Sequence, residues 1–144
     1  MPLKHLALRF CQSLFLAAAF CAALPLRAEV TDIDVAALAR LAASGVTVVD
    51  VRTPDEWRET GVIGGSRQLT YTGVDPQWLE KMKAIAPPDQ PVAVICRTGG
   101  RSAAAAKLLD QSGYKKIYNA QGGMTAWIKA GLPVTPLAAA EGKK

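Results

Sequence analysis

Two hydrophobic patterns alternate along the chain between residues 34 and 130. Short apolar runs rich in β-branched residues predict buried strands at 46–50, 91–95 and 117–118, and another short strand is predicted at 67–70. Helical spacing of apolar residues and capping signals predict helices at 34–43, 53–59, 75–86, 102–111 and 124–130. Continuous apolar strands are typical of a parallel sheet, because helices cover both of its faces. The pattern therefore predicts an α/β fold with a parallel sheet between two helical layers.

The N-terminal segment differs from this pattern and resembles a secretory signal peptide. Lys4 and Arg9 precede or border a mostly apolar stretch at 10–26, and the small residue Ala28 precedes the first acidic residue of the chain. We expect cleavage after Ala28, with cleavage after Ala23 as the alternative. An uncleaved membrane anchor is the competing interpretation, although a membrane span needs about 20 apolar residues.

This assignment divides the chain into three parts. A signal peptide is expected at 1–28, a single domain at 29–136 and a flexible tail at 137–144. The expected location is the periplasm or another exported compartment, and the membrane is contacted only through the export signal.

Net charge gives no indication of a nucleic-acid partner. The chain has 17 basic and 12 acidic residues, a formal net charge of +5, but three of the basic residues lie in the predicted leader. The expected mature domain carries 14 basic residues against 12 acidic ones, scattered along its length. So small an excess argues against binding to nucleic acid or to a membrane surface.

The cysteines and the histidine narrow the possible chemistry further. Cys11, Cys21 and the one histidine, His5, all lie in the predicted leader, so Cys96 is the only thiol of the expected mature domain. That domain can form no internal disulfide and has no imidazole base. It also lacks histidine ligands for zinc, and we expect no metal and no cofactor.

The chemistry is expected in the loop that follows the 91–95 strand, because ligands of such sheets bind beyond the carboxyl ends of the strands. Cys96 opens this loop, and Gly99 and Gly100 allow successive backbone N–H groups to turn toward one point. The helix that begins near Ser102 adds unpaired N–H groups and the positive end of its dipole. Two arginines, at 97 and 101, add positive charge. These features favour an anion and the thiolate form of Cys96, although a lone cysteine at a strand end can also be inert.

The loop sequence Cys96-Arg-Thr-Gly-Gly-Arg101 resembles the C-x-x-G-x-R active-site loop of the rhodanese superfamily. Further stretches agree in the order typical of that family: Val49 to Arg52 with Glu56-Trp57, Gly61 to Ser66, and Tyr118 to Trp127 with Gly131 to Val134. The resemblance covers residues 31 to 135, and the short chain looks like the single-domain periplasmic members. It implies a three-layer fold around a mainly parallel five-stranded sheet.

The resemblance also implies a function, the transfer of a sulfane sulfur from thiosulfate or another anionic donor to a thiol or cyanide acceptor. Cys96 would carry the sulfur as a persulfide. The donor would be held by the loop residues, which are Arg97, Thr98, Gly99, Gly100 and Arg101. In this interpretation the Arg101 side chain orients the donor, while Asp50, Arg52 and Ser102 support the site. A purely structural ion-pair network is the alternative for Asp50 and Arg52, and it is the favoured interpretation for Glu56.

The sequence departs from the family pattern at 61–66, where Gly-Val-Ile-Gly-Gly-Ser replaces the usual G-H-I-P-G-A. We expect this connection to be looser than usual.

Two other functions are compatible with a cysteine loop of this kind. A phosphatase or arsenate reductase would use a C-x5-R loop, whereas Arg101 gives C-x4-R, and a persulfide-holding or partner-binding module would show no turnover. The sulfurtransferase hypothesis requires loop amides that point inward and a thiol that solvent can reach.

Overall fold

The computed structural model describes residues 28–137 of the 144-residue chain. The predicted leader, apart from Ala28, and the predicted tail, apart from Leu137, lie outside the described residues. The described part contains five strands and five helices in alternating order. In chain order they are β1 (Glu29–Ile33), α1 (Val35–Ala43), β2 (Thr47–Asp50), α2 (Pro54–Thr60), β3 (Arg67–Gln68), α3 (Pro76–Ile85), β4 (Val92–Ile95), α4 (Gly100–Gln111), β5 (Lys116–Ala120) and α5 (Gly123–Lys129).

The five strands form one parallel sheet in the order β1-β5-β4-β2-β3. All four neighbouring pairs run parallel, and Val49 of β2 lies opposite Val94 of β4 at the centre. Parallel neighbours require crossovers, and the helices supply them. The expected five-stranded α/β fold is therefore confirmed.

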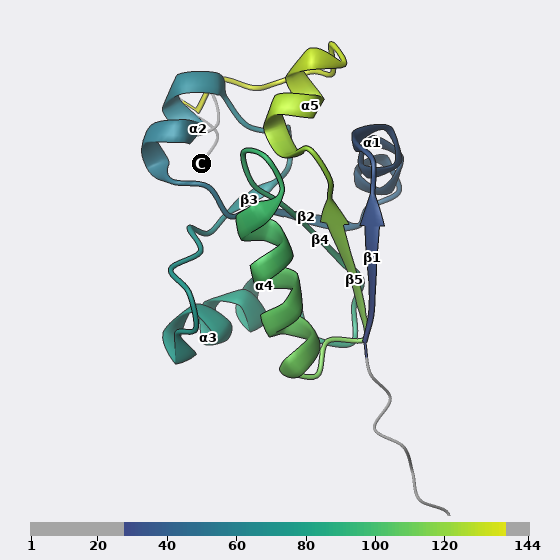
Figure 1. Cartoon of the computed structure of the whole chain (residues 1–144), viewed down its shortest axis with the longest axis vertical. Coiled ribbons are helices and arrows are strands. Elements are labelled where there is room, and N and C mark those ends of the chain that lie inside the picture. Colours follow the sequence, from purple (N-terminus) through teal and green to yellow (C-terminus); the bar gives the residue numbers. More distant parts are fainter. Residues whose placement is uncertain (1–27, 138–144) are drawn as a thin grey trace, which may run out of the picture.

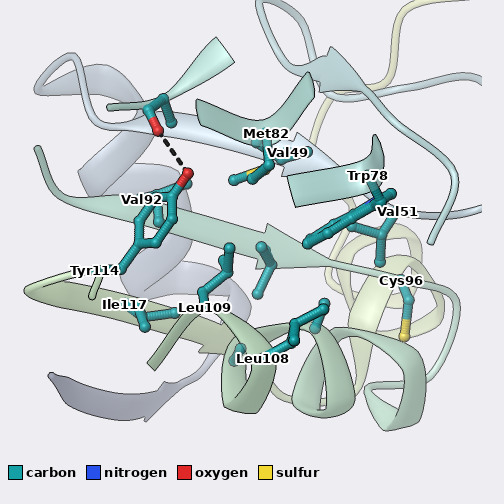
Figure 2. Close-up of a cluster of buried hydrophobic side chains, with 14 residues drawn as sticks. Val49, Val51, Trp78, Met82, Val92, Cys96, Leu108, Leu109, Tyr114 and Ile117 are labelled. Carbon is teal, nitrogen blue, oxygen red and sulfur yellow. Dashed lines mark hydrogen bonds between the residues drawn. The ribbon is translucent and has the colours of Figure 1, made fainter. Parts of the chain in front are cut away.

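Helices cover both faces of the sheet, and each face has its own core (Figure 1). On one face α3 and α4 pack against β2, β4 and β5 through Trp78, Met82 and Leu109, all of them buried. On the other face α1 and α5 pack through Leu38 and Trp127. Figure 2 shows Cys96 at the end of the first core, near Val51 and Trp78. The thiol therefore sits where a packed core meets the carboxyl edge of the sheet.

The structure corrects several predicted boundaries. The strand β1 was not predicted, because it is a half-exposed edge strand whose Glu29 and Asp32 interrupt any apolar run. The helix α4 begins at Gly100, two residues before the predicted start, because Gly99 takes the N-cap position at φ 110°. As a result Arg101 lies in the first turn of a helix rather than in a loop. Strand β5 is longer than predicted and ends at Ala120.

The 61–66 connection is packed, so the expectation that it would be loose is wrong. Val62 and Thr135 exchange two backbone hydrogen bonds of 2.8 and 2.7 Å, which tie the connection to the segment after α5. Val62 and Ile63 are buried, and the Ser66 hydroxyl donates to the Ile63 carbonyl. Backbone pairing with Thr135 therefore holds this connection in place. Within residues 28–137, no helix is both long and apolar enough to cross a bilayer.

Candidate active site

The site is built where β4 passes into α4 through a tight turn. β4 ends at Ile95, and α4 begins at Gly100, so only Cys96 to Gly99 connect them. Gly99 adopts a left-handed conformation that side chains strongly disfavour. This conformation bends the backbone N–H groups of the turn back toward the end of the strand.

The sulfur atom of Cys96 lies inside this turn and accepts hydrogen bonds from it. The Gly99 N–H donates to Sγ at 3.0 Å, and the Ser102 hydroxyl lies 3.4 Å from it. Burial raises the pKa of the Cys96 thiol, but the Ser102 hydroxyl and the N–H groups of Ser102, Gly99 and Thr98 outweigh burial and leave the pKa below its ordinary value. The loop therefore favours the thiolate, as a nucleophilic sulfur requires.

Solvent access to the thiol differs from the expectation. Cys96 is 1 % exposed, so the sulfur is covered in this structure. Its side chain turns toward the first turn of α4 and joins the core beneath it (Figure 2). The loop residues above it, Arg97 and Thr98, are exposed. The inward amides are present, but a donor can reach the sulfur only if the loop moves.

Helix α5 holds the loop backbone from the other side. The Met124 N–H donates to the Cys96 carbonyl at 2.8 Å, and the Thr125 N–H donates to the Arg97 carbonyl at 3.0 Å. A Cβ atom placed on Gly123 would lie 2.4 Å from that same Cys96 oxygen. The sequence did not assign a role to this glycine, and only the absent side chain allows the close approach.

The two arginines of the loop are both directed to Glu56 on α2. Arg101 Nη1 donates to Glu56 Oε2 at 2.8 Å and Nη2 donates to Oε1 at 2.7 Å, whereas Arg97 Nε lies 3.7 Å from Oε1. The Arg101 hydrogen bonds lower the pKa of Glu56 to about 2, although its partial burial opposes the shift. In this structure the Arg101 guanidinium is thus engaged in an ion pair rather than presented to a donor.

A buried ion pair fixes α2, which carries Glu56. Asp50 and Arg52 are 0 % and 1 % exposed, and Arg52 Nη2 lies 2.6 Å from Asp50 Oδ2. Arg52 also donates to the Thr60 hydroxyl and to the Glu56 and Gly61 carbonyls. This network satisfies the buried guanidinium and ties β2 to the middle and the C-terminal end of the short helix. Asp50 and Arg52 therefore connect to the cysteine loop through α2 and Glu56.

The hollows near the sheet ends do not reach the sulfur. One hollow of about 100 Å³ opens beside the loop between α2 and α5, and its lining includes Arg97, Glu56 and Ile128. A larger one of about 250 Å³ lies beside Gly45 and Thr47, at the opposite end of β2. Cys96 lines neither of them. Among residues 28–137, no three His, Cys, Asp or Glu side chains gather closely enough to hold a metal ion.

The tryptophans near the site lie mainly in the core. Trp78 and Trp127 are each 2 % exposed, and Trp57 is half-buried. The rings of Tyr71 and Trp78 are in a T-shaped arrangement, with centroids 5.2 Å apart. These contacts are those of packed side chains.

Fold and site together define a class of protein: a parallel α/β domain with one cysteine at the carboxyl edge of its central strand, surrounded by backbone N–H groups. The chain matches the family described as "Rhodanese-like domain" over residues 34–130. It belongs to the rhodanese superfamily and forms a single domain of that fold.

Known relatives agree with this assignment. The chain is 36 % identical over 107 residues to a sulfurtransferase of Allochromatium vinosum. This alignment covers 73 % of the present chain and 94 % of the relative. It is 33 % identical over 115 residues to thiosulfate sulfurtransferase 18 of Arabidopsis thaliana, covering 74 % and 84 % of the two chains. The crystal structure of a rhodanese-related protein from Thermoplasma volcanium superposes with a TM-score of 0.60 at 35 % identity, covering 73 % and 97 %.

Proposed function

We propose that this protein is a sulfurtransferase that takes a sulfane sulfur from thiosulfate and carries it as a Cys96 persulfide. The proposal rests chiefly on one observation, the hydrogen bonds from the Gly99 N–H and the Ser102 hydroxyl to the sulfur atom. The names of the two curated relatives support sulfur transfer in general, and one of them names thiosulfate.

The reaction needs no group beyond the thiolate and the two substrates. The Cys96 thiolate attacks the outer sulfur of thiosulfate, the S–S bond of the donor breaks, and sulfite leaves with the electron pair. The persulfide that results is an anion, and the N–H groups of Thr98, Gly99 and Ser102, which favour the thiolate, would also stabilise the persulfide. An acceptor such as cyanide then attacks the outer sulfur, forms thiocyanate and releases the Cys96 thiolate.

The length of the loop between Cys96 and Arg101 favours the binding of a sulfur atom over that of a phosphoryl group. Arg101 follows Cys96 by five positions, one fewer than in a C-x5-R phosphatase loop, and α4 begins at Gly100. The short turn places the Gly99 N–H at 3.0 Å from the cysteine sulfur, which leaves little space for a tetrahedral phosphoryl group. We therefore propose sulfur transfer rather than phosphate hydrolysis.

A non-catalytic module is the second candidate, and one observation favours it. Cys96 is 1 % exposed, so neither donor nor acceptor reaches the sulfur without a shift of the loop. A protein that holds a persulfide for a specific partner could keep its sulfur covered in this way. Turnover with small substrates separates the two candidates.

The test is a thiosulfate–cyanide assay that follows thiocyanate. We expect steady turnover by the wild-type chain and none by Cys96→Ser, because a hydroxyl at this position is not ionised at neutral pH. An aryl phosphate serves as the competing substrate. Transfer that persists in the serine variant, or phosphate release in place of thiocyanate, would refute the proposal, while a persulfide that forms without turnover would favour the carrier module.

We also propose that the protein acts after export and cleavage of residues 1–28. The proposal rests on the sequence pattern of that segment. Intact-mass analysis of protein from the exported fraction would give the first residue of the mature chain. It would also reveal an additional sulfur atom bound to Cys96.

A further inference from the structure

Glu56 occupies an unusual position because it serves two elements at once. On its own helix it is the N3 residue of a capping box, in which its carboxylate accepts from the Thr53 N–H at 2.9 Å. Across the site the same carboxylate binds both terminal nitrogens of Arg101, which lies 45 residues further along. Its side chain is only 16 % exposed. The pair therefore links α2 to the first turn of α4 directly above the cysteine loop.

The two arginines next to Cys96 differ in how firmly they are held. Arg101 has a bidentate bond to Glu56 and is 36 % exposed. Arg97 is 67 % exposed, and its Nε is 3.7 Å from the carboxylate, beyond hydrogen-bonding distance. A bidentate charge-assisted pair fixes a guanidinium in direction as well as in distance. Arg101 is thus anchored, while Arg97 keeps the freedom of an exposed side chain.

From these contacts we infer that Glu56 is a positioning residue for sulfur transfer, which anchors Arg101 and so keeps the loop amides closed around Cys96. This inference rests on the proposed function for its catalytic meaning. Three elements meet at the loop, and each holds it by a different contact: α4 through the Ser102 hydroxyl, α5 through the Met124 N–H, and α2 through Glu56. Only the last contact joins two side chains of opposite charge, Glu56 and Arg101.

The alternative is that Glu56 acts only through its negative charge. The two explanations predict different changes in the Cys96 pKa. If only charge matters, Glu56→Gln lowers the thiol pKa and Arg101→Gln raises it, because the two variants remove charges of opposite sign. If the pair holds the amides in place, both variants raise the pKa, because both release the loop and weaken the hydrogen bonds to sulfur.

The experiment uses the full-length chain with Cys11→Ser and Cys21→Ser, so that Cys96 is the only thiol. Thiolate absorbance gives the pKa in each variant. The rate of alkylation by iodoacetamide is measured at pH 10, where the thiol is ionised and the rate reports access. Glutamine retains the capping box, because Gln also accepts from the N-cap N–H, so α2 is expected to stay folded. Glu59→Gln is the matched control, an exposed acid on the same helix.

We expect both Glu56→Gln and Arg101→Gln to raise the pKa and to speed alkylation about tenfold, with no further gain in the double variant. Opposite pKa changes, or alkylation rates equal to that of Glu59→Gln, would overturn the inference. Neither readout requires turnover. A wild-type chain that fails with thiosulfate would therefore refute the proposed function and leave the test of Glu56 intact.

Discussion

The contact between Gly123 and the cysteine loop allows the sharpest prediction from this structure. In Gly123→Ala the new Cβ would lie 2.4 Å from the Cys96 carbonyl oxygen and 2.6 Å from the Arg97 carbonyl group. These neighbours are backbone atoms, so they cannot move aside as a side chain could. The residue also has a φ of +57°, which an alanine adopts only with strain.

Three costs combine in this variant: the left-handed conformation, the overlap with backbone, and the weakened bond from Met124 to Cys96. Together they correspond to a loss of about 3 to 5 kcal/mol of unfolding free energy. Gly131→Ala is the matched control, because its φ is +69° but nothing lies within 4 Å of the added Cβ. Its expected loss is only about 1 to 2 kcal/mol, from backbone strain alone.

Urea unfolding followed by tryptophan fluorescence measures both losses, and the slope of the transition shows whether the folded states are comparable. Sulfur transfer should fall in Gly123→Ala well beyond the decrease in folded protein, because α5 then no longer positions the Cys96 carbonyl. Equal losses of stability in the two variants would show that the contact with the loop contributes nothing, and the reasoning would be wrong.

Three further predictions concern the charges of the site. Ser102→Ala should raise the pKa of Cys96, because the thiolate loses a hydrogen bond. Since activity requires the thiolate, the variant should lose activity at a higher pH than the wild type when the medium is acidified. An unchanged pH profile of kcat/KM would contradict the role of this hydroxyl. Arg52→Ala should cost about 3 to 5 kcal/mol in urea unfolding, because it leaves Asp50 buried without its partner, whereas exposed Arg67→Ala should cost less than about 0.5 kcal/mol. The folded pKa of Glu56, about 2 against an ordinary 4.5, means that its pairing stabilises the fold above pH 4.5 and is lost as the pH falls toward 2. The stability gap between wild type and Glu56→Gln should therefore narrow over that window, and a constant gap would argue against the ion pair.

The sequence indicated the fold through its most strongly buried segments. β2 and β4 are rich in β-branched residues, and their burial on both faces makes them easy to recognise. β1 was missed for the opposite reason, since an edge strand needs only one buried face and tolerates Glu29 and Asp32. The start of α4 was placed too late because two adjacent glycines usually indicate a loop, whereas here Gly99 caps the helix and Gly100 begins it.

The candidate site was predictable where its chemistry is local. Cys96, Gly99 and Ser102 lie within seven consecutive residues, so the hydrogen-bond donors around the sulfur could be inferred from the motif alone. The partner of Arg101 could not be inferred, because Glu56 is 45 residues away and its capping role already explained its presence. The covered state of the sulfur depends on how the loop packs, and no sequence pattern encodes it.

The position of β1 has a consequence for the order in which the domain can assemble. Its only neighbour in the sheet is β5, and Glu29 pairs with Lys116, a residue 87 positions later. The first strand therefore has no hydrogen-bonding edge available until nearly the whole domain has been synthesised. Because β5 is the last strand of the sheet in chain order, the pairing of β1 is a contact between the two ends of the domain.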